Sequence, residues 1–152
     1  MAIRKAAPLD SGEDRAGESA EPLAAAFARG WQLRAQLLQA EGGTLTVTEV
    51  ARRLGLTRQA VEQQRRAGHL LALPTERRRY AYPAWQFTPD GVLPGLVDTL
   101  ADLQVRSPWM RAAFFLGRNV YLDGASPLGE LRRGRVAAVR RAAQAYGEHG
   151  AA

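Results

Sequence analysis

Apolar residues between positions 46 and 61 recur at the spacing of two short amphipathic helices. Val50 and Leu54 are four residues apart, so they share one helical face. Gly55 follows at a position where a tight turn favours a positive φ, and Val61 marks the buried side of a second helix. The pattern predicts a helix-turn-helix, with Leu56 filling the angle between the helices.

The ends of both helices carry recognisable signals. Thr46 and Glu49 have the spacing of a capping box, in which each side chain accepts a hydrogen bond from the other's backbone N–H. Thr57 is placed to cap the second helix, and Gly68 to end it. Gln64 departs from the pattern, because a buried apolar residue is more usual there.

Polar side chains occupy the outward face of the second helix. Arginine can pair bidentately with guanine and glutamine with adenine, so a helix with this face suits the DNA major groove. An ordinary surface helix would also carry such residues, and that alternative stays open. The candidate DNA contacts here are Thr57, Arg58, Gln59, Glu62, Gln63 and Arg66.

Two short apolar runs follow the second helix and enclose a basic segment. Residues 70–74 and 80–83 predict a hairpin, and a hairpin after a recognition helix is a wing. Arg77, Arg78 and Arg79 at its turn would lie beside a phosphate backbone, although a basic loop without a ligand is the alternative. We expect Trp85 and Phe87 to anchor the hairpin.

The flanking segments complete a mainly α fold with three parts. Residues 1–20 predict a disordered tail. Residues 21–90 hold a helix from Pro22 to the Gly42–Gly43 pair, the helix-turn-helix and the wing, with a turn at residues 88–91 as the boundary. Residues 91–152 predict a small helical domain. The apolar stripe of the first helix comprises Leu23, Phe27, Leu33, Leu37 and Leu38.

Helical spacing recurs throughout the C-terminal part. The spacing of five apolar residues predicts a helix over residues 93–103, and further helices are expected to start at Ser107-Pro108, at Ser126-Pro127 and at Arg135. Gly117 and Gly134 are the expected helix ends.

One segment of this region resembles the toxin-binding domain of the Xre/MbcA/ParS antitoxin family. The match comprises Asn119, the string Leu122-Asp123-Gly124-x-Ser126-Pro127-Leu128, and then Gly134 and Val136. It covers roughly residues 90–147, downstream of a helix-turn-helix as in the family. Many relatives have an acidic residue directly after the Pro-Leu pair. This chain has Gly129 at that position, and its acidic residue, Glu130, comes one position later.

The resemblance implies an antitoxin that binds a RES-domain, NAD-consuming toxin and represses its own promoter. From the residues alone, Asp123-Gly124 is a turn and Ser126-Pro127 a helix start in any fold. The candidate toxin contacts are Asn119, Leu122, Asp123, Arg132, Arg133, Arg140, Tyr146, Glu148 and His149.

Composition narrows the choice of partner. The formal net charge is +6, and residues 51–80 carry eight arginines against Glu62 and Glu76, which suits phosphate contacts. The chain has no Cys, and His69 and His149 are its only histidines. We therefore expect no enzyme, no cofactor and no metal site.

The sequence also predicts where the protein is located in the cell and how it assembles. It has no apolar run of the ~20 residues that span a membrane, and no signal peptide. We expect a cytoplasmic protein that binds double-stranded DNA as a homodimer. The alternative function is a stand-alone regulator, of phage-repressor or excisionase type, whose C-terminal half dimerises.

Overall fold

The structure is a computed structural model that describes residues 24–26 and 28–147. The expectations for residues 1–20, Pro22, Leu23, Phe27, Glu148 and His149 lie outside the described residues. The chain divides into two units, residues 1–36 and 37–152. In the first unit, residues 24–26 and 28–36 are helical. Leu33, a member of the expected apolar stripe, is 53% exposed there.

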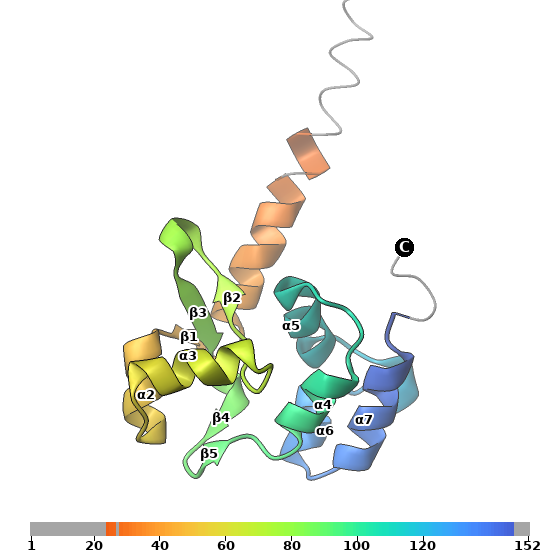
Figure 1. Ribbon diagram of the computed structural model, residues 1–152. Helices are drawn as coiled ribbons and strands as arrows, with labels where there is room; N and C mark the ends of the chain where they lie inside the picture. The colour runs from red at the N-terminus through yellow and green to blue at the C-terminus, as the bar shows by residue number, and fades with distance from the viewer. Residues whose placement is uncertain (1–23, 27, 148–152) are drawn as a thin grey trace, which may run out of the picture. The chain divides into compact units, whose positions relative to one another are not determined.

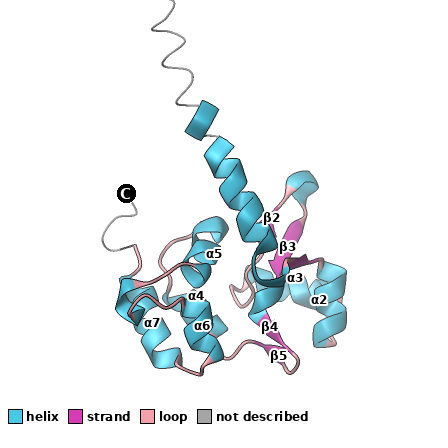
Figure 2. Ribbon diagram, turned by 180° about the vertical axis from the view of Figure 1, so that it is seen from behind, coloured by secondary structure: helices cyan, strands magenta, loops and turns pink. Residues whose placement is uncertain are grey.

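The second unit is mainly helical with small antiparallel sheets (Figures 1 and 2). Its first helical residues, 37–39, run into the 3-10 helix η2 (Ala40–Gly42), which ends beside Gly43 as expected. The α-helices are α2 (Val47–Leu54), α3 (Arg58–Arg66), α4 (Leu96–Asp102), α5 (Pro108–Leu116), α6 (Pro127–Arg132) and α7 (Val136–Ala145).

The hairpin expected after α3 is present, and it belongs to a three-stranded sheet. Strand β3 (Tyr80–Pro83) lies between β2 (Leu73–Pro74) and β1 (Thr44–Leu45). The register pairs Leu73 with Ala81 on one side and Thr44 with Pro83 on the other. Neither β1 nor the second pair, β4 (Phe87–Thr88) with β5 (Gly91–Val92), was predicted.

Local signals fix where the C-terminal helices begin. The Ser107 hydroxyl accepts a hydrogen bond from the backbone N–H of Met110 at 3.4 Å, and Ser126 does the same for Gly129 at 3.0 Å. In both cases proline follows at the first helical position. Helix α4 begins at Leu96, later than predicted, because Gly95 before it has a φ of 87°.

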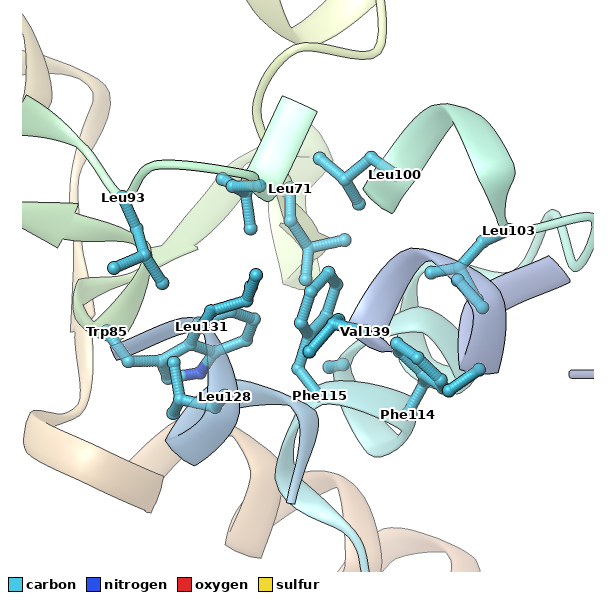
Figure 3. Close-up of a cluster of buried hydrophobic side chains, with 14 of the residues drawn as sticks. Leu71, Trp85, Leu93, Leu100, Leu103, Phe114, Phe115, Leu128, Leu131 and Val139 are labelled. Atoms are coloured by element: carbon cyan, nitrogen blue, oxygen red, sulfur yellow. The ribbon is translucent and has the colours of Figure 1, made fainter. Parts of the chain in front are cut away.

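Two groups of buried side chains form the core of this unit. The smaller joins α2, α3 and the sheet around Val50, Val61 and Tyr82. The larger centres on Phe115, whose ring lies 5.1 Å from that of Trp85, and Figure 3 shows these side chains converging. The larger group contains residues from both sides of position 90, so the domain boundary there stays a prediction.

A glutamine supports the base of the hairpin from within the core. The 3-10 helix η4 (Ala84–Gln86) places Gln86 where its side chain is fully buried. Its amide Oε1 accepts a hydrogen bond from the Leu71 N–H, and its Nε2 donates one to the Leu71 carbonyl, both at 2.8 Å. The buried amide thus has a partner at both its oxygen and its nitrogen, and both belong to the backbone of Leu71, which lies outside the strands.

Candidate nucleic-acid interface

Helices α2 and α3 are joined by the turn that their sequence predicts. The Thr46 hydroxyl accepts from the Glu49 N–H at 3.2 Å while the Glu49 carboxylate accepts from the Thr46 N–H at 3.4 Å, which completes the capping box. Gly55 has a φ of 68°, and the Thr57 hydroxyl accepts from the Ala60 N–H at 3.0 Å. These local bonds fix where α3 begins.

The buried side of α3 differs from the prediction at one position. Val61 is fully buried, as expected, but Leu56 is 41% exposed and does not fill the angle between the helices. The helices meet through Val50 and Ala51 instead, which leaves Leu56 on the outside of the turn. Gln64 is half-buried and bonds the Nδ1 atom of His69 at 2.9 Å.

The outward side of α3 is a continuous polar face. Thr57 is exposed but its hydroxyl is occupied by the cap. The other five candidates have exposed side chains on α3: Arg58, Gln59, Glu62, Gln63 and Arg66.

The hairpin presents its arginines through an irregular turn. Arg77 and Arg78 have φ values of 65° and 59°, within the 3-10 helix η3 (Glu76–Arg78). The carbonyl of Arg79 accepts hydrogen bonds from the backbone N–H of Thr75 at 2.9 Å and from its hydroxyl at 3.1 Å. A positive φ is costly for arginine, and such strain is more common at functional positions than elsewhere. All three arginines are exposed.

A groove of about 480 Å³ lies between α3 and the hairpin. It brings together Arg58 and Glu62 from the helix with Arg78 and Arg79 from the hairpin. The other five candidates, Thr57, Gln59, Gln63, Arg66 and Arg77, do not line it. The residues that sequence reasoning missed are Thr46, Val47, Thr48, Tyr80 and Tyr82.

The missed tyrosines had a weak signal in the sequence, since they directly follow the arginine run. Burial raises the pKa of Tyr82, and the nearby Arg65 offsets part of that rise. Tyr82 therefore stays protonated at neutral pH. The wall of the groove between the arginines is neutral, and its charge comes from the guanidinium groups and Glu62.

The segment that resembles the antitoxin family forms a compact turn. Asn119 caps the 3-10 helix η5 (Val120–Leu122) by accepting from the Tyr121 N–H at 2.9 Å. Asp123 then adopts a left-handed conformation with a φ of 56°, and its side chain is exposed. Leu122 is only 8% exposed within the larger core, so this side chain is not available on the surface, contrary to its selection as a contact.

The remaining described candidates in this region already have intramolecular partners. Tyr146 stacks against Phe114, with ring centroids 5.0 Å apart. Three arginines form salt bridges, Arg132 with Glu41 at 3.1 Å, Arg133 with Glu130 at 3.5 Å, and Arg140 with Asp102 at 2.7 Å. The sequence could not reveal two of these pairs, since Arg132 and Glu41 are 91 positions apart and Arg140 and Asp102 are 38 apart.

Two exposed apolar residues beside the same turn were not selected from the sequence. Val120 is 84% and Tyr121 58% exposed. They line a groove of about 350 Å³ together with Arg118 and Tyr146.

Residues 24–26 and 28–147 contain no helix long and apolar enough to cross a membrane. The same ranges contain no group of three or more His, Asp or Glu residues placed to hold a metal ion.

Comparison with known proteins gives a similarity of fold. No protein-family model and no curated protein matches the chain. Among solved structures, the chain is similar to the NMR structure of Rv2175c, with 27% sequence identity and a TM-score of 0.59. The alignment covers 71% of this chain and 83% of that one, so the likeness extends over most of both folds.

Proposed function

We propose that this protein is a regulator that binds double-stranded DNA through a winged helix-turn-helix. In this proposal α2 and α3 are the two helices of the motif and the β2–β3 hairpin is the wing. The observation that carries it is the groove in which Arg58 of α3 faces Arg78 and Arg79 of the hairpin. Cations on two separate elements suit two neighbouring parts of one polyanion.

The exposed face of α3 would enter the major groove. Arg58, Gln59, Gln63 and Arg66 are the candidates for base edges, because their side chains are exposed and have donor patterns that match purines. Glu62 can accept a hydrogen bond from a cytosine amino group. The hairpin arginines would contact phosphates, which orient the protein on the duplex without reading its sequence.

We further propose that the protein binds as a homodimer in the cytoplasm, on its own promoter. Two motifs related by a two-fold axis can engage half-sites about 34 Å apart, and this geometry is the usual source of operator affinity. Analytical ultracentrifugation with and without operator DNA would measure the stoichiometry.

The DNA proposal can be tested on the recognition face. Arg58→Ala, Gln63→Ala and Arg66→Ala change exposed side chains, so the fold should be retained, and each should weaken binding to the promoter fragment by about 1–3 kcal/mol. Arg141→Ala, an exposed arginine on α7, is the matched control. Equal affinity of all four variants in fluorescence anisotropy would overturn the proposal.

A second candidate function is neutralisation of a RES-domain toxin, which would make the protein an antitoxin that also represses its operon. The observation that favours it is the exposed pair Val120 and Tyr121, located inside the segment that resembles the toxin-binding domain. An apolar pair beside a groove is a common form of anchor in a protein–protein interface.

The full chain is needed to test this candidate, because a fragment ending near residue 91 would divide the larger core. Val120→Glu with Tyr121→Ala should abolish co-purification with a RES-domain protein encoded beside this gene, while promoter binding persists. Unchanged co-purification would exclude this surface. If no RES-domain protein is encoded there, the stand-alone regulator remains.

A further inference from the structure

A second cleft, smaller than the groove, shares Tyr80 with it. It has a volume of about 200 Å³, and three arginines line it without any carboxylate. Arg65 comes from α3, Arg106 from the connector before α5, and Arg111 from α5 itself. The DNA-binding proposal uses none of them.

These arginines are held in place by contacts that do not neutralise them. The Arg65 guanidinium carbon lies 3.9 Å from the centroid of the Tyr80 ring, and its buried Nε has no hydrogen-bond partner. Arg111 donates from Nε to the Val105 carbonyl at 2.8 Å. None of the three forms a salt bridge with a carboxylate of the described chain, although four arginines of α6 and α7 and the turn between them do.

Gathering these charges has an energetic cost. Burial lowers the pKa of Arg111, which means that its charged form is partly desolvated. Like charges around a small cleft also repel one another, the more so where water is partly excluded. An anion in the cleft would offset both costs through its attraction to the guanidinium groups.

We infer that this cleft binds a phosphate group or a small oxyanion of similar charge. Guanidinium groups donate paired hydrogen bonds in a planar fork that matches phosphate oxygens. The volume lies below the roughly 300–1,000 Å³ of a site for a drug-sized ligand, so the cleft fits a phosphate or pyrophosphate rather than an entire nucleotide. Leu70 and Pro108 close its walls.

The phosphate can come from two sources that share this chemistry. Tyr80 lines both the cleft and the groove, so a phosphate of DNA bound in the groove lies close by. A free phosphorylated molecule is the other source. The two are distinguished by whether the cleft affects DNA affinity in the absence of added anion.

The test uses the full chain and inorganic pyrophosphate as the probe. Arg106→Gln is the informative variant, since this exposed side chain makes no hydrogen bond or salt bridge within the described chain, and Arg141→Gln is the control with the same change in charge. Binding is measured by calorimetry at constant ionic strength, and the Nε–H signals of Arg65 and Arg111 are followed by NMR. Thermal unfolding checks that both variants fold.

We expect saturable binding that Arg106→Gln weakens about tenfold or more and Arg141→Gln leaves unchanged, with both Nε–H signals shifting. Non-saturable shifts, or equal affinity of the two variants, would overturn the inference.

Promoter titrations without pyrophosphate then identify the source. If DNA supplies the phosphate, Arg106→Gln lowers promoter affinity and reduces the slope of log K against log salt by about 1. If the ligand is a free anion, this variant binds promoter DNA as tightly as the unmodified protein. The calorimetric result does not use DNA, so it stands or falls independently of the proposed function.

Discussion

Arginines in two regions of the second unit differ in how they relate to nearby carboxylates. In α2, α3 and the hairpin, none of the eight arginines between residues 51 and 80 forms a salt bridge with a described carboxylate. Around α6 and α7, Arg132, Arg133, Arg135 and Arg140 all do. Arginines around α6 and α7 are thus engaged by carboxylates of the same chain, whereas arginines of α2, α3 and the hairpin remain available to a ligand.

The comparison shows why composition alone is a poor guide to a binding surface. A paired arginine must lose its partner before it can bind an anion, so its contribution to binding is reduced by the interaction already made. An arginine with a stacked or solvated side chain has no such competition. A cluster of arginines therefore predicts a binding site for a polyanion only where the fold places no carboxylates beside the arginines.

The largest effect should come from the hairpin. Arg78→Ala with Arg79→Ala is expected to lower promoter affinity about 100-fold, because two phosphate contacts are lost, and to reduce the salt slope by about 2. Arg132→Ala with Arg133→Ala removes the same charge from the paired region and should change affinity by no more than about twofold. Equal losses in the two double variants would break the comparison, since net charge alone would then explain binding.

A smaller effect is expected from the buried partner of two paired arginines. The Glu130 side chain is 6% exposed and accepts from Arg135 at 3.0 Å and Arg133 at 3.5 Å. Glu130→Gln should lower the free energy of unfolding by about 1–2 kcal/mol, because charge-assisted hydrogen bonds are lost. Glu62→Gln, at an exposed and unpaired carboxylate, should change it by less than about 0.5 kcal/mol in urea titrations.

Signals confined to a few residues were readable from the sequence. Both caps of the α2–α3 pair, the Ser-Pro starts of α5 and α6, and the hairpin depend on neighbours no more than eight positions away, so propensity and spacing predict them. Exposure of the five α3 side chains followed from helical periodicity in the same way.

Features that depend on distant contacts were not readable. Strand β1 has two residues and gains its partner only when β3 folds back beside it. The pairing of Arg132 with Glu41 and the cleft around Arg65 and Arg111 join residues that are far apart in sequence. The salt bridges of the arginines chosen as toxin contacts were hidden in the same way, because the sequence does not show which carboxylates the fold brings beside them.

The smallest effect concerns acid stability. Hydrogen bonding to Arg140 lowers the pKa of Asp102, so this carboxylate stabilises the fold above its unfolded-state pKa, near 3.9, and the contribution disappears as pH falls through the lower folded-state value. Asp102→Asn should lower the Tm by about 2 °C at neutral pH, with the difference vanishing in strong acid. A difference that grows below pH 4 would contradict this account.

Gln86 has a consequence for how this sheet ends. Its side-chain amide offers Leu71 one acceptor and one donor, the pair that a neighbouring strand would offer through a peptide group. A single side chain thus satisfies the backbone of Leu71 from inside the core, two residues before β2 begins. The position accepts neither a hydrocarbon, which would orphan two backbone groups, nor a carboxylate, which cannot donate, so its amide is constrained as tightly as a glycine in a left-handed turn.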